Sequence, residues 1–453
     1  MHDLGIIGAG PGGYVAAERA GQAGLETILF EKGELGGVCL NTGCIPTKTL
    51  LNSVKHLSHA REAKAFGVIA ENVDFDFKAM MKRKQKVVKK LVAGVGAKMK
   101  HNNVTVVNGE AVIQERSGNG VVVKCGDETY EFKNIIIATG SLAAIPPIKG
   151  LDRDQVLTNV EALDLKELPK KMVVIGGGVI GMEFTDIFNT LGVDVTIIEM
   201  MPEVMPSMDS DLAAMLRKTF EKRGVEFHLS AKVTKLDGKT VSFEKDGETH
   251  SIEAGEVLVS VGRTPNCQGC GLENIGVETQ KGTIKVDEKC RTNIPGVYAI
   301  GDVTGGALLA HTASRAGEVV VNNLTGRNDW FRKDAIPWVE YTHPEVAGVG
   351  LTEDQAKEAG RDIEIRKLPM AYAGRFVAET HREDGFCKIL ADPETGQVLG
   401  VHMIGGGCSE MIYGAAMALE MEMTLDELEE VIFPHPTVSE IIRETVFAFR
   451  DKV

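Results

Sequence analysis

The sequence lacks several features that would place it outside the ordinary globular proteins. It has no run of about 18 consecutive apolar residues, which a membrane-spanning helix requires. Its 8 Cys are too few, in 453 residues, for a secreted framework held together by disulfides. It also lacks an excess of basic residues. The formal net charge is −14, which argues against nucleic acid or an anionic membrane as the main partner.

A secretory leader is also missing, because Met1–Asp3 run directly into the apolar residues Leu4–Ile7. We therefore expect a soluble cytoplasmic protein. In a reducing compartment, closely spaced cysteines indicate catalysis or metal binding. A chain of 453 residues predicts two to four domains of roughly 100–200 residues each.

Strand and helix patterns alternate through the first two thirds of the chain, which predicts an α/β fold. A strand at Leu4–Ile7 ends in a glycine-rich loop, and a helix over Tyr14–Ala23 and a strand over Thr27–Phe30 follow. The same plan recurs later, with strands predicted at Met172–Ile175 and Asp194–Ile198. This repeat of one supersecondary unit predicts two nucleotide-binding folds.

Three further segments predict a long helix, a linker and a C-terminal domain. Phe77–Lys100 has helical periodicity, with Val87, Val88, Leu91, Val92 and Val95 on an apolar face. The opposite face, expected to be solvated, carries Lys82, Arg83, Lys84, Lys86, Lys89 and Lys90. Prolines 146 and 147 indicate a linker. From about Trp330, alternating strands and a closing helical segment, Asp426–Phe449, predict a separate C-terminal domain.

The first glycine-rich loop has the spacing of a dinucleotide-binding site. Gly8 allows the tight turn, Gly10 lets a pyrophosphate approach the backbone, and Gly13 lets helix and strand pack closely. The N-terminus of the following helix offers free N–H groups to the anion. Glu31 lies where a carboxylate can bind a ribose hydroxyl. A merely structural turn is the alternative.

The second loop repeats this arrangement with Gly176, Gly178 and Gly181, and Glu199 occupies the matching acidic position. A carboxylate there accepts hydrogen bonds from a ribose 2′-hydroxyl but repels a 2′-phosphate. No Arg follows Glu199 directly, so the sequence favours NAD over NADP.

Cys39 and Cys44 stand directly downstream of the first loop unit. In a regular helix they would be separated by a rise of about 7.5 Å, whereas a disulfide needs Cα atoms roughly 4.4–6.8 Å apart. A bond between them therefore requires a distorted turn, which Gly43 can supply. Pro46 fits the first turn of a following helix, and a nearby helix N-terminus or Lys48 would lower a thiol pKa. Two buried core thiols remain the alternative.

These motifs together resemble the flavin- and pyridine-nucleotide-dependent disulfide oxidoreductases over essentially the whole chain. In chain order, the resemblance rests on the first loop, the cysteine pair, Ala138–Gly140, the second loop, Val261–Asn266, Tyr298–Asp302 and His435–Glu440. It implies two Rossmann-like nucleotide-binding domains and a C-terminal α+β dimerisation domain. The implied boundaries are 1–143 and 262–332 for an FAD-binding and central domain, 144–261 for an NAD-binding domain, and 333–453 for the interface domain.

The resemblance also implies residue roles. Asp302 would hydrogen-bond the ribityl chain of the flavin, and Lys48 and Glu183 would pair beside its ring. The residues implied to bind FAD are Gly8, Gly10, Gly13, Glu31, Lys48, Thr139, Gly140, Asp302 and Ala310. Those implied to bind NAD are Gly176, Gly178, Gly181, Glu199 and Gly262.

His435 lies between Pro434 and Pro436, and a lone histidine is more often structural than catalytic. The resemblance reverses this reading. It implies that His435 is the general base and that Glu440 orients it, as in other base–carboxylate pairs. In the family this pair reaches the active site from the second subunit, so a homodimer is implied.

Within the family, the acid at Glu199 and a C-terminus without an extra cysteine pair (Phe449–Val453) favour the branch that oxidises protein-bound dihydrolipoyl groups with NAD. The dithiol would lose a proton to His435 and attack Cys39, leaving Cys44 as a thiolate beside FAD. The expected partners are the lipoyl domains of an acyltransferase or a glycine-cleavage carrier protein.

Three alternatives remain at this point. They are an NAD-linked reductase of another small disulfide, a non-catalytic docking subunit, and a flavin oxidase. The Cys39/Cys44 pair counts against the last. Cys267 and Cys270 depart from the family pattern and could bind metal or form a second disulfide. Without a second ligand pair, we interpret them as incidental thiols and expect no metal site.

Overall fold

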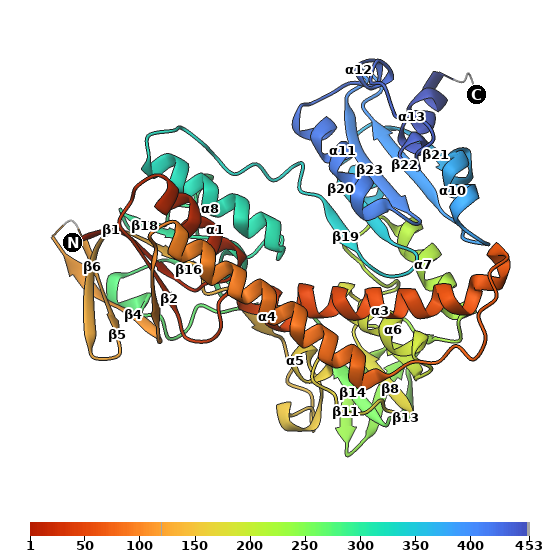
Figure 1. Ribbon diagram of the computed structural model, residues 1–453, viewed down its shortest axis with the longest axis horizontal. Helices are drawn as coiled ribbons and strands as arrows, with labels where there is room; N and C mark the ends of the chain where they lie inside the picture. The colour runs from red at the N-terminus through yellow and green to blue at the C-terminus, as the bar shows by residue number, and fades with distance from the viewer. Residues whose placement is uncertain (119, 451–453) are drawn as a thin grey trace. The chain divides into compact units, whose positions relative to one another are not determined.

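The computed structural model describes residues 1–118 and 120–450 (Figure 1). The chain divides into two compact units, each built from three segments. The first unit comprises Met1–Thr49, Lys78–Ala144 and Gly262–Arg332. The second unit comprises Leu50–Phe77, Ile145–Val261 and Lys333–Val453.

The first unit contains a sheet in the order β3-β2-β1-β6-β5-β4, with β18 also paired to β6. The strands β3, β2, β1, β6 and β18 are parallel, whereas β5 and β4 are antiparallel. The bounds are β1 His2–Ile7, β2 Thr27–Glu31, β3 Thr105–Asn108, β4 Ala111–Ser117, β5 Gly120–Cys125, β6 Glu128–Ile137 and β18 Val297–Ala299. Short strand pairs join β7 Ser141–Ala143 to β15 Arg263–Pro265 and β16 Thr279–Gln280 to β17 Thr283–Ile284.

The central strand β1 is apolar because it is covered on both faces. Leu4 and Ile6 have no exposed surface, as is typical of a parallel strand between helices. Helices α1 (Pro11–Gln22) and α8 (Ala310–Leu324) run side by side (Figure 1). A Cβ at Gly317 would lie only 2.8 Å from the Gly12 carbonyl oxygen, so the close approach of these helices requires glycine.

Helix α4 spans Phe77–His101, which confirms the predicted helix, and it follows α2 (Gly37–Thr42) and α3 (Cys44–Glu62). Its predicted faces need one correction. Lys84 is buried and Leu91 is 38% exposed. The buried positions follow helical spacing through Met81, Lys84, Val95 and Met99, and Lys84 falls within that stripe. A lysine can take such a position because its methylene stem packs against apolar neighbours.

In the second unit, the region that contains the second glycine-rich loop is built on a parallel sheet in the order β10-β9-β8-β14. The bounds are β8 Lys171–Ile175, β9 Asp194–Ile198, β10 Glu226–His228 and β14 Glu256–Val259. An antiparallel sheet holds β11 Lys232–Asp237, β12 Thr240–Lys245 and β13 Glu248–Glu253. The helices of this region are α5 Asn159–Ala162, α6 Val179–Thr190 and α7 Ser210–Lys222.

The C-terminal region of the second unit is built on an antiparallel sheet in the order β19-β20-β23-β22-β21. The strands are β19 Trp338–Glu340, β20 Val346–Gly350, β21 Glu364–Pro369, β22 Phe386–Ala391 and β23 Val398–Ile404. The helices are α9 Glu353–Glu358, α10 Gly374–Glu379, α11 Cys408–Glu420, α12 Leu425–Glu429 and α13 Glu440–Phe447. Every residue of β22 and β23 is buried.

The predicted closing helix, Asp426–Phe449, is wrong as a single element. Residues 430–439 separate α12 from α13 and form no helix. Pro434 and Pro436 explain the break, because proline lacks the N–H group that a helix interior needs and clashes with the preceding turn. The interruption places His435 on a loop directly before α13.

An ion cluster around a buried lysine ties β22 to the start of α7 within the second unit. Lys388 on β22 is 1% exposed, and its Nζ lies 2.9 Å from Asp209 Oδ1, 2.8 Å from Asp211 Oδ2 and 3.0 Å from Glu353 Oε2. Asp209 also caps α7, since its side chain accepts a hydrogen bond from the Asp211 N–H. Burial alone lowers the pKa of Lys388, but its hydrogen bonds with Asp211 and Asp209 outweigh this and raise it.

Replacing Lys388 with methionine should lower the free energy of unfolding by about 3–5 kcal/mol, because Asp209 would be left buried without its cation. Urea unfolding followed by circular dichroism measures the loss. Lys367→Met is the matched control: Lys367 also pairs with Asp211, at 2.9 Å, but its side chain is 43% exposed. The control should cost only about 0–1 kcal/mol, and equal losses in the two variants would contradict the assignment.

The same cluster predicts an acid dependence. Although burial opposes it, hydrogen bonds from Lys388 and Lys367 lower the pKa of Asp211 to about 2, from 3.8. The stability contributed by this carboxylate is therefore present above pH 3.8 and disappears as the pH falls toward 2. The difference in stability between the wild type and Lys388→Met should shrink over that interval.

Candidate active site

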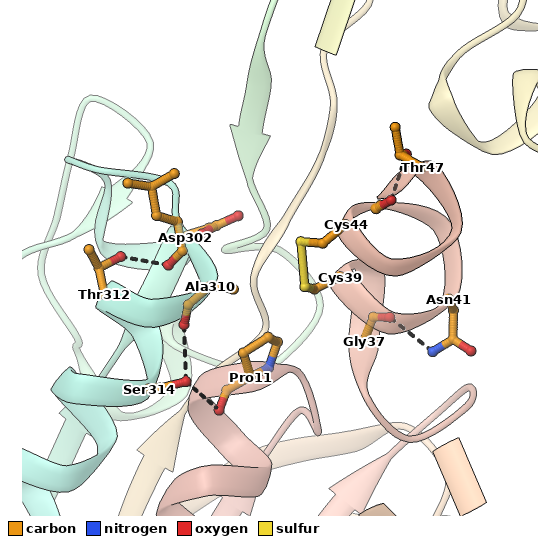
Figure 2. The surroundings of a disulfide bond; sticks show 12 residues. Pro11, Gly37, Cys39, Asn41, Cys44, Thr47, Asp302, Ala310, Thr312 and Ser314 are labelled. Atoms are coloured by element: carbon orange, nitrogen blue, oxygen red, sulfur yellow. Dashed lines mark hydrogen bonds between the residues drawn. A yellow bond between two sulfur atoms is a disulfide. The ribbon is translucent and has the colours of Figure 1, made fainter. Parts of the chain in front are cut away.

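A disulfide joins Cys39 to Cys44 in the first unit, as the sequence allowed. Cys39 lies in α2, and Cys44 is the first residue of α3, so the helix breaks at Gly43 between them. The Cα atoms are 4.7 Å apart, which is within the range of a disulfide. Over the same five residues a regular helix would rise about 7.5 Å. Thr47 Oγ1 donates to the Gly43 carbonyl oxygen at 2.7 Å, which helps fix the break (Figure 2).

The first glycine loop lies between β1 and α1 and has the geometry of an anion site. Gly8 adopts φ +103°, and a Cβ there would collide with the Ala138 backbone, while a Cβ at Gly13 would collide with the Gly8 carbonyl oxygen. By contrast, the position of a Cβ on Gly10 has no atom within 4 Å. Gly10 caps α1 without a side-chain hydrogen bond. The loop therefore fits a pyrophosphate against the helix N-terminus.

Glu31 at the end of β2 is held by the same loop. Its carboxylate accepts hydrogen bonds from the N–H of Ala9 at 2.8 Å and from the N–H of Gly33 at 2.8 Å. These bonds fix the acid at the carboxyl end of the parallel sheet, where nucleotide ribose binds in such folds.

The second loop, in the second unit, reproduces this geometry. Its glycines and its acid each follow their counterparts in the first loop by the same number of residues. Gly176 adopts φ +102°, and a Cβ on Gly181 would collide with the Gly176 carbonyl oxygen. Glu199 accepts hydrogen bonds from the N–H of Gly177 at 2.6 Å and of Met201 at 2.7 Å. Both loops thus have the features that fit a dinucleotide, and in each an acid is held by backbone N–H groups next to the loop.

Asp302 belongs to a polar network around the β7–β15 strand pair. Ser141 donates to Asp302 Oδ2, and Arg263 donates to both Ser141 Oγ and the Ser141 carbonyl oxygen at 2.7 Å. Arg263 Nε also lies 3.8 Å from Asp302 Oδ2. Sequence reasoning missed Ser141 and Arg263 as positioning residues. Both stand inside or next to the quoted motifs, Ala138–Gly140 and Val261–Asn266.

The remaining residues implied for FAD also lie in the first unit. Thr139 Oγ1 donates to the Asn266 carbonyl oxygen at 2.7 Å, and Gly140 accepts from the N–H of Asn266 at 2.8 Å. Ala310 is the first residue of α8, which has no side-chain cap. Figure 2 shows the disulfide on the side of its helices that faces Asp302 and Ala310.

The two residues implied to lie beside the flavin ring belong to different units. Lys48 lies on α3 in the first unit. Glu183 lies on α6 in the second unit, is 3% exposed, and accepts a hydrogen bond from the Tyr341 N–H at 3.3 Å. Gly262, implied for NAD, is the first residue of the last segment of the first unit.

The loop before α13 brings His435 and Glu440 together, as the family resemblance implies. His435 Nδ1 lies 2.9 Å from Glu440 Oε1, and the other carboxylate oxygen accepts from the Thr437 N–H at 2.9 Å. These two hydrogen bonds, with Thr437 and then with His435, lower the pKa of Glu440. The His435 side chain is 80% exposed in the single chain, whereas that of Glu440 is only 16% exposed.

The other six cysteines form no disulfide. Desolvation raises the pKa of Cys267 and raises that of Cys270 to about 11, so both remain protonated thiols at neutral pH. Within residues 1–118 and 120–450, no cluster of three His, Cys, Asp or Glu side chains could hold a metal ion. In that same part of the chain, every helix is too short or too polar to cross a bilayer.

Comparisons with known proteins agree with these features. Residues 2–317 match the family model described as pyridine nucleotide-disulphide oxidoreductase, and residues 336–446 match its dimerisation domain. Dihydrolipoyl dehydrogenases of Rhizobium etli and Bacillus subtilis are each 42% identical to this chain. They align with 98% and 97% of it over 97% and 94% of their own lengths. The leghemoglobin reductase of Glycine max is also 42% identical, with coverage of 100% and 88%.

Solved structures have the same fold. The crystal structure of LpdA from Mycobacterium tuberculosis superposes with a TM-score of 0.91 at 27% identity, covering 99% of this chain and 100% of that one. The HOCl-induced flavoprotein disulfide reductase RclA of Escherichia coli superposes with a TM-score of 0.85 at 28% identity, covering 99% of each chain.

The chain therefore belongs to the pyridine nucleotide-disulphide oxidoreductase family. It is a flavoprotein oxidoreductase with a redox disulfide, and its family uses FAD and NAD(H). The predicted α/β fold with a C-terminal dimerisation domain is confirmed.

Proposed function

We propose that this protein is a dihydrolipoyl dehydrogenase, which oxidises protein-bound dihydrolipoyl groups to lipoyl groups with NAD+. The observation that carries the proposal is the Cys39–Cys44 disulfide at the start of α3. It occurs in a chain 42% identical, over nearly its whole length, to dihydrolipoyl dehydrogenases.

The two glycine loops divide the cofactors between them. Gly8, Gly10, Gly13 and Glu31, with the Asp302 network and the uncapped N-terminus of α8 at Ala310, would hold FAD. Gly176, Gly178, Gly181 and Glu199 would hold NAD. On this basis residues 1–143 and 262–332 form the FAD-binding and central domain, 144–261 the NAD-binding domain, and 333–453 the interface domain. When bound, FAD would supply the two-electron chemistry that links the reduced cysteines to NAD.

The chain's own residues carry out the thiol exchange. One substrate thiol loses its proton to His435, and the resulting thiolate attacks Cys39 Sγ, which breaks the bond to Cys44 and forms a mixed disulfide. The second substrate thiol then attacks the substrate sulfur of the mixed disulfide, its proton passes to the leaving Cys39 sulfur, and the lipoyl ring closes. Both cysteines are left reduced, Cys39 as a thiol and Cys44 as the thiolate that would lie beside the flavin. Lys48 and Glu183 would pair beside the ring.

The homodimer completes this site. A dimerisation domain occupies residues 336–446, and the exposed apolar side chains Tyr413 and Ile432 belong to it. His435, exposed in one chain, would serve the disulfide of the second subunit, held in orientation by Glu440. Its physiological partners would be lipoyl domains of an acyltransferase or a glycine-cleavage carrier protein, in the cytoplasm.

A steady-state comparison tests the proposal. The purified flavoprotein should have a higher kcat/KM for dihydrolipoamide than for other small dithiols or for the monothiol glutathione. It should also prefer NAD over NADP by about 100-fold or more, because Glu199 would face the 2′-phosphate with a like charge. Faster turnover of another dithiol would contradict the substrate assignment, and equal use of NADP would contradict the role of Glu199.

A further inference from the structure

Methionines gather in the segment that follows Glu199. Of the 17 Met in the chain, four lie within residues 200–208. Met205 and Met208 are buried, at 2% and 8% exposure, whereas Met200 and Met201 are 65% and 41% exposed. The segment thus presents two accessible thioethers directly after the acid.

The backbone holds the two exposed methionines close to the carboxylate. The Met201 N–H donates to Glu199 Oε1 at 2.7 Å, and the Met201 carbonyl oxygen accepts from the Ser230 N–H at 3.0 Å. Further along, the Met205 N–H donates to the Gly177 carbonyl oxygen at 2.9 Å. The segment is therefore bonded both to the acid and to the glycine loop.

If the second loop binds NAD, as proposed, this placement puts the two exposed methionines next to the adenine of that cofactor. The pyrophosphate of a bound dinucleotide would lie at the N-terminus of α6, and its ribose would lie at Glu199. The adenine extends from the ribose on the side away from the pyrophosphate. The adenine would therefore reach the residues that follow Glu199, where a thioether offers a polarizable surface to an aromatic ring.

We propose that Met200 and Met201 form a peroxide-sensitive modification site that controls the affinity for NAD. Hydrogen peroxide transfers one oxygen atom to each thioether sulfur, giving methionine sulfoxide and water. The inference rests on the proposed function. A sulfoxide is polar and carries a strong hydrogen-bond acceptor, so it replaces the apolar surface beside the adenine. The change is reversible by methionine sulfoxide reductases.

The test uses the FAD-loaded enzyme with the Cys39–Cys44 disulfide intact, treated with dilute hydrogen peroxide. Burial raises the pKa of Cys267, Cys270 and Cys387, so these thiols are protonated and react slowly. Peptide mass mapping should find oxygen on Met200 and Met201 but not on Met205 or Met208. The KM for NAD should rise about 2- to 10-fold, while kcat and the KM for dihydrolipoamide stay unchanged.

Two variants separate this site from general oxidation. The double variant Met200→Leu/Met201→Leu, which keeps an apolar surface, should retain its KM for NAD after peroxide. Met421→Leu removes another thioether, 73% exposed in the single chain, and should respond like the wild type. Excess NAD during treatment should protect residues 200 and 201, and sulfoxide reductases MsrA and MsrB should restore the KM.

Three outcomes would overturn the inference. They are oxidised Met200 and Met201 with an unchanged KM for NAD, an equal rise of that KM in the double leucine variant, and failure of peroxide to modify either residue. A different result, no NAD-dependent dithiol oxidation by the untreated enzyme, would contradict the proposed function. The two failures are therefore distinguishable.

Discussion

Serine in place of Cys44 should lower the rate of NAD reduction by dihydrolipoamide about 1,000-fold or more, since covalent exchange through the disulfide would be lost. The hydroxyl group cannot form the bond that now joins residues 39 and 44. Without that bond, a substrate thiolate has no disulfide sulfur to attack, and the electron pair cannot enter the protein. NADH formation in the steady state measures the loss, and flavin content and melting temperature check that the variant is folded.

Cys267→Ser is the matched control. Cys267 is a free, partly exposed thiol in the same unit, and its Sγ donates to the Gly282 carbonyl oxygen at 3.1 Å, a bond that a serine hydroxyl can replace. This variant should keep wild-type turnover within a factor of about two. If Cys44→Ser kept activity within about tenfold of the wild type, the exchange mechanism would be wrong.

Local patterns in the sequence were enough to predict the two nucleotide folds. The strand at Asp194–Ile198 agrees with the structure at both ends, and the glycine loops form the turns that their spacing requires. These features depend on neighbours within about thirty residues, so the signal lies in one stretch of sequence. For the Cys39–Cys44 pair, the five-residue offset and Gly43 allowed a disulfide but left two buried thiols as the alternative, and the family resemblance favoured the disulfide that the structure shows.

Contacts between residues that lie far apart in the sequence could not be predicted from local patterns. The ion cluster around Lys388 joins residues that lie far apart in the sequence, and no periodicity marks Lys388 as buried. Arg263 and Ser141 meet only because β15 pairs with β7. Lys84 is buried because tertiary packing sets which helix stripe is covered.

His435 combines a local signal that the helix prediction overlooked with a contact that only the structure shows. Its two flanking prolines were visible, yet the predicted helix ran through them. The family resemblance supplied the role of the residue, and the structure supplied its contact with Glu440 at 2.9 Å. The hydrogen bonds from Thr437 and His435 lower the pKa of Glu440, so this carboxylate is charged at neutral pH. A charged Glu440 favours the tautomer with the proton on Nδ1, which leaves Nε2 as a base.

His435→Gln should therefore lower kcat for dihydrolipoamide oxidation by about 100- to 10,000-fold, the usual contribution of a positioned general base. Because glutamine cannot take up a proton, the remaining activity should rise with pH as the substrate thiol ionises by itself. A pH profile of kcat/KM measures this change. His101→Gln, at the exposed end of α4, is the control and should behave like the wild type. A pH profile unchanged from the wild type would contradict the role of His435 as the base.

A mixed dimer of the two inactive chains distinguishes a site shared between subunits from a site within one chain. Cys44→Ser and His435→Gln chains with different affinity tags would be co-expressed, and the mixed dimer purified through both tags. If His435 serves the disulfide of its partner, one site in each mixed dimer combines an intact disulfide with an intact base. The mixed dimer should then recover about half of the wild-type rate. If each chain used its own histidine, neither site would be intact, and activity would stay at the level of the parent variants. The His435 side chain is 80% exposed in the single chain. Recovery of activity would therefore also require the second copy to cover that exposed side chain.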